Sequence, residues 1–100
     1  MDLNKSIRMA VESGKVLVGT RESKRSIVNG KGKVVILSNN CPKDTQRDIE
    51  YYTSLAKIPL IRFKGTSLEL GEVCGFPYPV SVMVVLEEGD SDILKFVEGE

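Results

Sequence analysis

The sequence predicts an α/β fold, a three-layer α/β/α sandwich in which helices cover both faces of a four-stranded mixed sheet. Segments with apolar residues at helical spacing alternate with short apolar runs, and the connections between them are short. The clearest of these runs, residues 34–37, is apolar at every position, which is typical of a strand buried on both faces. With 100 residues and no internal repeat or linker, the chain is expected to form one domain, residues 1–100.

The first half of the chain predicts two helices and two strands. The first helix begins after Asp2, whose side chain suits an N-cap, and ends at Gly14. A strand over residues 16–18 and a helix over residues 20–28 follow. Glycines then end that helix before a second strand over residues 34–37.

The second half begins with the longest predicted helix, from residue 43 or 44 to Ala56. The Ile58-Pro59 step ends it, because the residue before a proline avoids helical backbone. A third strand over residues 60–63 follows. Apolar residues of the two middle helices are expected to face inward, namely Ile27, Val28, Ile49, Tyr52, Leu55 and Ala56.

A short fourth helix and a fourth strand complete the expected fold. Thr66 and Glu69 fit a capping box at the start of the helix, which ends at Gly75. A strand over residues 80–86 follows a proline-containing loop. Residues 93–97 are expected to add a short turn and an edge segment.

The residue types exclude most catalytic chemistry. The chain has no histidine, the commonest general base, and its two cysteines lack a CxxC spacing. It contains no nucleotide-binding glycine motif, and no apolar run approaches the roughly 20 residues that span a bilayer. We therefore expect a cytoplasmic protein with free thiols, no enzymatic activity, no cofactor or metal, no small-molecule substrate and no membrane contact.

The charge is balanced overall but uneven along the chain. Residues 1–50 carry ten Lys or Arg against six Asp or Glu, whereas residues 51–100 carry four against eight. Within residues 15–33 there are six cations and only one carboxylate, Glu22. A neutral chain with a local basic patch indicates a local contact with nucleic acid. Chance clustering on a solvated surface is the alternative.

Three loops at strand–helix boundaries are candidates for one binding site. They are Gly19-Thr20-Arg21-Glu22, Asn39-Asn40-Cys41-Pro42-Lys43 and Gly75-Phe76-Pro77-Tyr78-Pro79. The first two follow strands of the same direction and are expected at one end of the sheet, where ligands bind in open α/β folds. The third reaches that end only if the strand after it runs antiparallel to those strands.

Each loop offers groups that suit RNA. Arg21, with Lys24 or Arg25, would neutralise phosphates at a helix N-terminus, where unpaired N–H groups favour anions. Asn40 has a donor and an acceptor for a base edge, and Phe76 and Tyr78 would stack on an unstacked base. The alternatives are a solvated basic face for the cations, turn formation for Asn40 and core packing for the two rings.

The loops and several further segments resemble the e-type ribosomal protein thirty family of the archaeal and eukaryotic large subunit, within the kink-turn-binding superfamily. The likeness covers essentially the whole chain. The matching segments are Val18-Gly19-Thr20-Arg21, Asp48-Ile49-Glu50-Tyr51-Tyr52, Gly65-Thr66-Ser67-Leu68-Glu69-Leu70-Gly71 and Gly89-Asp90-Ser91-Asp92-Ile93-Leu94.

The resemblance implies a noncatalytic protein that binds a kink-turn or similar internal loop of ribosomal RNA. It implies contacts to sheared G·A pairs at the helix start after the first strand, and packing of the third loop on a flipped-out nucleotide. The expected RNA-binding residues are Gly19, Thr20, Arg21, Glu22, Lys24, Arg25, Asn40, Lys43, Phe76, Pro77 and Tyr78. One departure is Arg21-Glu22, where the wider superfamily commonly has Asn-Glu. The departure bears on the guanine contact, because arginine is longer than asparagine and offers no hydrogen-bond acceptor.

The resemblance also implies a place in the cell. The main hypothesis is a structural protein of the large ribosomal subunit, with ribosomal RNA and neighbouring ribosomal proteins as partners and a monomer off the ribosome. The absence of a lysine-rich extension favours an archaeal source. Two alternatives stay open: the kink-turn-binding core protein of an RNA-processing or RNA-modification particle, and a protein-interaction module of the same fold.

Overall fold

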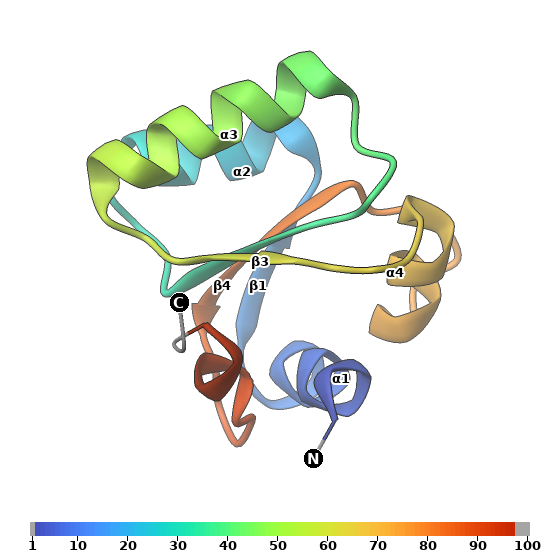
Figure 1. Ribbon diagram of the computed structural model, residues 1–100. Helices are drawn as coiled ribbons and strands as arrows, with labels where there is room; N and C mark the ends of the chain where they lie inside the picture. Colours follow the sequence, from blue (N-terminus) through green and yellow to red (C-terminus); the bar gives the residue numbers. More distant parts are fainter. Residues whose placement is uncertain (1, 98–100) are drawn as a thin grey trace.

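The computed structural model describes residues 2–97 and alternates helices with strands along the chain (Figure 1). The elements are α1 (Leu3–Ser13), β1 (Lys15–Val18), α2 (Thr20–Val28), β2 (Val34–Leu37), α3 (Lys43–Ala56), β3 (Leu60–Arg62), α4 (Ser67–Cys74), β4 (Val82–Glu87) and the 3-10 helix η1 (Ile93–Phe96). In the part of the chain that is described, no helix is long and apolar enough to cross a membrane.

The four strands form one mixed sheet in the order β1-β4-β2-β3. The last strand, β4, lies inside the sheet and runs antiparallel to both β1 and β2, whereas β2 and β3 are parallel. Val84 of β4 therefore faces Leu17 of β1 on one side and Val35 of β2 on the other. The predicted mixed, four-stranded sheet is confirmed, and β1, β2 and β3 all point in one direction.

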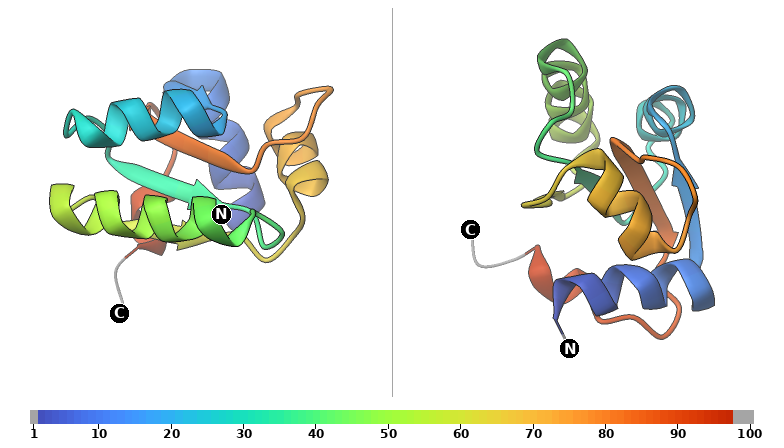
Figure 2. Two further views of the ribbon diagram at one scale, coloured as in Figure 1. Left: turned by 90° about the horizontal axis from the view of Figure 1, so that it is seen from above. Right: turned by 90° about the vertical axis from the view of Figure 1, so that its right-hand side faces the viewer.

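Two helical layers enclose the sheet, as the α/β/α prediction requires. Helices α2 and α3 lie side by side on one face, and α1, α4 and η1 lie on the other (Figures 1 and 2). Alternation along β2 serves both cores, because Val35 and Leu37 pack toward Ile27 and Ile49, whereas Val34 and Ile36 belong to the opposite core. Each core is built mainly from buried aliphatic side chains.

The local start signals in the sequence form the predicted caps. The Asp2 side chain accepts a hydrogen bond from the Lys5 N–H at 2.8 Å. Thr66 and Glu69 make both halves of the capping box of α4. These contacts join residues only three positions apart, so the sequence pattern alone predicts them.

Two of the expected inward positions are wrong. Val28 is 61% exposed and Leu55 is 65% exposed. In a helix with about 100° per residue, Val28 is turned well away from the buried Ile27, and Leu55 well away from the buried Ile49. Thr53, four residues after Ile49, takes the inner position instead and donates its hydroxyl to the Ile49 carbonyl at 2.8 Å.

Two predictions near the C-terminus also need correction. The fourth strand begins at Val82, not residue 80, because the Val80 N–H donates to the Ser67 carbonyl at 2.9 Å and thus pairs with α4. Residues 93–96 form η1 and no edge strand. Ile93 is fully buried in the core that also contains residues of α1, which favours a compact turn there.

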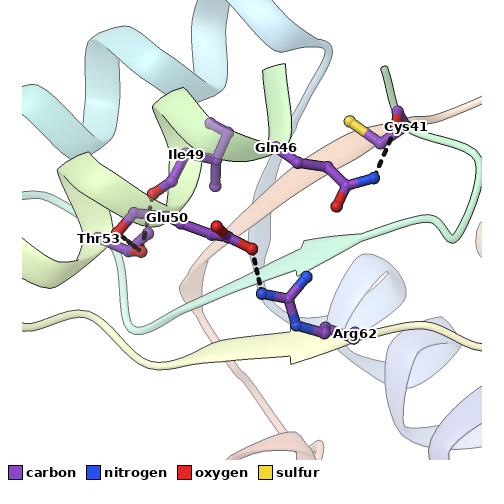
Figure 3. A network of polar contacts seen from close by, with 6 residues as sticks. All are labelled: Cys41, Gln46, Ile49, Glu50, Thr53 and Arg62. Carbon is purple, nitrogen blue, oxygen red and sulfur yellow. Dashed lines mark hydrogen bonds and ion pairs between the residues drawn. The ribbon is translucent and has the colours of Figure 1, made fainter. Parts of the chain in front are cut away.

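Side-chain contacts hold α3 in place above the sheet (Figure 3). Gln46 donates its amide N–H to the Cys41 carbonyl at 2.7 Å, which ties the first turns of α3 to the loop before it. Farther along, Glu50 forms an ion pair with Arg62 of β3. Through Gln46, α3 therefore fixes the position of the loop between β2 and α3.

Candidate nucleic-acid interface

The strand directions bring the three candidate loops to one end of the sheet. We call residues 19–22, 38–43 and 75–81 together the loop end; it lies on the right of Figure 1. The Gly19 N–H donates to the Val82 carbonyl at 3.0 Å, and the Ser38 N–H donates to the Ser81 carbonyl at 2.9 Å. Because β4 is antiparallel to β1 and β2, its first residues join the loops that follow those two strands.

The first loop turns directly from β1 into α2. Gly19 has φ +100° and ψ 150°, a backbone conformation that favours glycine. Apart from its chain neighbours, no atom of the described residues lies within 4 Å of the place where a Cβ would be. Among residues 2–97 no side chain caps α2, so the N–H groups of its first turn lack that partner. Thr20 is half-buried, whereas Arg21 and Glu22 are exposed. Glu22 itself lies in the first turn, where the helix dipole favours a carboxylate.

The cations around this helix start differ in whether an acidic side chain pairs with them. The Lys24 ammonium donates to Asp48 of α3 at 2.8 Å, and this hydrogen bond raises the pKa of Lys24. Arg21, Arg25 and Lys43 are exposed, and among residues 2–97 none of them forms an ion pair. Among the predicted RNA-binding cations, these three therefore carry charge that no residue of the described chain compensates; Arg21 and Lys43 lie in the loop end, and Arg25 lies about one turn farther along α2.

The second loop is held by its two asparagines. Asn39 donates through its side-chain amide to the Lys64 carbonyl at 2.8 Å, and its N–H donates to the Gly65 carbonyl at 2.9 Å. Asn40 is exposed, yet its amide oxygen accepts a hydrogen bond from the Ser67 N–H at 2.8 Å. The residues therefore connect this loop to the start of α4.

The third loop presents one ring and supports it with another. Phe76 and Tyr78 stack with their ring centres 5.3 Å apart and an interplanar angle of 10°. Phe76 is half-buried against the core of the α1–α4 face, whereas Pro77 is exposed and Tyr78 is 47% exposed. The core-packing alternative thus describes Phe76 in part, and Tyr78 is the ring available to a ligand.

One contributor to this loop was not assigned from the sequence. Gly71 lies inside α4, and a Cβ there would come within 2.1 Å of the Tyr78 carbonyl oxygen. Only a glycine lets the loop backbone approach the helix this closely. The signal was present in the sequence, because a glycine in a helix interior costs about 1 kcal/mol and indicates a close approach.

Other parts of the molecule offer little chemistry for catalysis. Cys41 and Cys74 are buried in different cores on opposite faces of the sheet, and burial raises the pKa of the Cys74 thiol to about 11. Within the described chain, no three metal-ligating side chains come together. A groove of about 890 Å³ lies between α1, β3 and α4, lined in part by Leu3, Phe63 and Val73, and contains none of the predicted RNA-binding residues.

Comparison with known proteins agrees with the family resemblance of the sequence. The model of the family described as "Ribosomal protein L7Ae/L30e/S12e/Gadd45 family" matches residues 1–95. The protein from Methanocaldococcus jannaschii named large ribosomal subunit protein eL30 is 49% identical over 98% of this chain and 89% of its own length. Proteins of the same name from Methanococcus vannielii and Methanothermobacter thermautotrophicus are 49% and 44% identical, over 94% and 97% of this chain and 90% and 99% of their own lengths.

Proposed function

The chain belongs to the ribosomal protein L7Ae/L30e/S12e/Gadd45 family, and from that premise we propose that it is a structural protein of the large ribosomal subunit. It binds a kink-turn or a similar internal loop of ribosomal RNA and catalyses no reaction. Its place is the ribosome in the cytoplasm, beside neighbouring ribosomal proteins. The whole chain acts as one domain, which is a monomer off the ribosome and takes no small-molecule substrate.

The observation that carries this proposal is the juxtaposition at the loop end. The start of α2, which no side chain of the described residues caps, shares one end of the sheet with the exposed ring of Tyr78. Exposed Arg21 lies at this helix start, and exposed Arg25 lies about one turn farther along. RNA internal loops combine closely spaced phosphates with unstacked bases. Cations and N–H groups suit the phosphates, and an aromatic face suits an unstacked base.

The roles divide among the three loops. Gly19, Thr20, Arg21 and Glu22 face the sheared G·A pairs, and Arg25 and Lys43 neutralise phosphate. Asn40 contacts the RNA through its side-chain amide, and Pro77 and Tyr78, supported by Phe76, pack on a flipped-out nucleotide. Lys24 contributes less than the arginines, because Asp48 already compensates its charge.

The relatives reported above favour the ribosome over the two alternatives. They carry the name of a large-subunit protein at 44% to 49% identity over nearly the whole of this chain. An RNA-processing particle would use the same loop end but a different RNA. A protein-interaction module would tolerate replacement of Arg21, Arg25 and Asn40 without loss of RNA binding.

Fluorescence anisotropy with a labelled kink-turn RNA at two salt concentrations tests the proposal. The control is the same RNA with its tandem G·A pairs changed to Watson–Crick pairs. We expect tight binding that the control RNA loses. With three uncompensated cations, the logarithm of the binding constant should fall with the logarithm of salt with a slope of about 2 to 3. Equal, weak binding to both RNAs would contradict the proposal and favour an interaction module.

A further inference from the structure

The side chain of Asn40 is held by two donors on the same oxygen. Its amide oxygen accepts from the Ser67 N–H at 2.8 Å and from the Ser38 hydroxyl at 3.0 Å. Ser67 is the first residue of α4, and it lies 27 residues from Asn40 in the sequence. This contact therefore couples the loop after β2 to the start of a helix on the other face of the sheet.

The donor at Ser67 fixes which way the amide of Asn40 points. A backbone N–H can only donate, so the group that faces it must be the oxygen and not the nitrogen. The amide nitrogen of Asn40 has no acceptor among residues 2–97, and the residue is exposed. Asn40 thus offers a ligand two N–H donors, while its oxygen is already used within the protein.

We propose that the Ser67 N–H is a positioning group of the RNA-binding surface, which holds Asn40 so that it contacts RNA only as a hydrogen-bond donor. This inference rests on the proposed function. The RNA atom opposite Asn40 is then an acceptor, either N7 or O6 of a purine or a phosphate oxygen. A bidentate pair with adenine, which needs the amide oxygen as well, is excluded.

The sequence permits an unusually selective test at Ser67. Ser67→Pro removes the N–H that holds Asn40, at the first helical position where proline is well tolerated. The preceding residue, Thr66, already has the extended backbone that proline requires, with φ −76° and ψ 171°. Ser67→Ala is the matched control, because it removes the hydroxyl and keeps the N–H.

Affinity for the kink-turn RNA is measured for both variants, alone and combined with Asn40→Ala, together with melting curves. We expect Ser67→Ala to bind like the unmodified chain and Ser67→Pro to bind about five- to tenfold more weakly, the scale of one lost hydrogen bond. In the Asn40→Ala background the proline should have no further effect. Equal affinities of the two Ser67 variants would overturn the proposal. So would a loss of affinity on Ser67→Pro that is just as large when Asn40→Ala is already present.

A second variant keeps the test decisive if the proline variant folds poorly. Asn40→Asp keeps an oxygen for Ser38 and Ser67 and places a carboxylate at the start of α4, so stability should be retained. It lacks the amide donors, so RNA affinity should fall at least as far as in Asn40→Ala. Binding by Asn40→Asp as tight as by the unmodified chain would show that no donor is needed. Failure of the unmodified chain to bind RNA would instead count against the proposed function.

Modified RNAs identify the acceptor. Purines are replaced one at a time by their 7-deaza forms, which lack N7, guanines also by 2-aminopurine, which lacks O6, and loop phosphates by uncharged methylphosphonates. One such change should weaken binding of the unmodified chain about tenfold and leave Asn40→Ala unaffected. An effect of a 7-deaza base would identify a contact to N7, an effect of 2-aminopurine a contact to O6, and an effect of a methylphosphonate a contact to phosphate. Adenines are also replaced by unsubstituted purine, which lacks the amino group. If this is the only replacement whose effect disappears in the Asn40→Ala variant, the oxygen of Asn40 contacts RNA and the proposal is wrong.

Discussion

A glycine flanks β1 at each end, and neighbouring backbone crowds one of them whereas the other has open space around it. A Cβ at Gly14, before the strand, would come within 2.0 Å of the Glu87 carbonyl oxygen. At Gly19, after the strand, a Cβ would meet no other segment of the described chain within 4 Å. We call the end of the sheet formed by residues 13–14, 32–33 and 87–90 the closed end, in contrast to the loop end.

The closed end satisfies its polar groups internally. The Ser13 hydroxyl accepts from the Asp90 N–H at 2.9 Å, and Lys33 pairs with Glu88 at 3.1 Å. The loop end leaves α2 uncapped and Arg21 without an ion pair in the described chain. Groups that the fold already satisfies gain little from a ligand. We therefore expect the closed end to contribute mainly to stability, and the loop end to bind RNA as proposed.

A substitution in the core, away from both ends, should give the largest change in stability. Ile49→Ala removes a fully buried side chain of α3 and should lower the free energy of unfolding by about 2–5 kcal/mol. The protein that remains folded should bind RNA as before. Urea unfolding and anisotropy on the same sample measure the two quantities. A transition that matches the unmodified chain would show that Ile49 contributes no packing.

A change at the closed end should affect stability alone. Gly14→Ala places a methyl group against the Glu87 backbone, and we expect a loss of about 1–3 kcal/mol in the free energy of unfolding. Gly30→Asn is the control, because Gly30 has open space around it and a φ of +72° that asparagine tolerates. A loss of RNA affinity in folded Gly14→Ala would break the division between the two ends.

A change at the loop end should do the reverse. Arg21→Ala should weaken RNA binding by about 1–3 kcal/mol, the range for a specific base contact, with an unchanged melting curve. Lys31→Ala is the control, since Lys31 belongs to the same basic segment of the sequence but follows α2, away from its N-terminus. Equal affinity of Arg21→Ala and the unmodified chain at fixed salt would remove Arg21 from the interface.

The aromatic pair sharpens the comparison within the loop end. Tyr78→Ala should weaken RNA binding by about 1 kcal/mol, at the low end for base stacking because the ring of Phe76 remains. Tyr78→Phe keeps the ring and should bind normally. Phe76→Ala should lower both affinity and stability, because its ring also packs on the core. Normal binding of Tyr78→Ala would exclude stacking on this ring.

The smallest expected effect comes from the ion pair between Lys24 and Asp48. Asp48 raises the pKa of Lys24 in the folded state, so the pair stabilises the fold below pH 10.5 and loses that contribution as pH rises through the folded pKa. For a solvent-exposed pair the contribution is about 0.2–1 kcal/mol. Melting curves of Lys24→Met and the unmodified chain between pH 8 and 11.5 should converge at the alkaline end. A constant difference would show that the pair contributes nothing.

Most of the helices and strands could be predicted because their signals are local. The capping box of Thr66 and Glu69 and the cap at Asp2 span three residues, and the buried strand Val34–Leu37 is apolar at each position. Predictions of which residues face inward from a helix were wrong at two positions. Apolar side chains at Val28 and Leu55 suggest burial, but the angle around the helix turns them outward.

The candidate site depended on contacts between distant residues. Nothing in the periodicity shows that β4 enters the sheet between β1 and β2, yet this order brings residues 75–81 beside the other two loops. Local patterns also do not show that the Asp48 carboxylate pairs with Lys24, or that the Ser67 N–H donates to the oxygen of Asn40. The sequence by itself determined the alternating elements, the residue types of each loop and the family resemblance. Tertiary structure alone decided which of their polar groups remain free, because strand order and helix packing choose partners that short-range patterns do not encode.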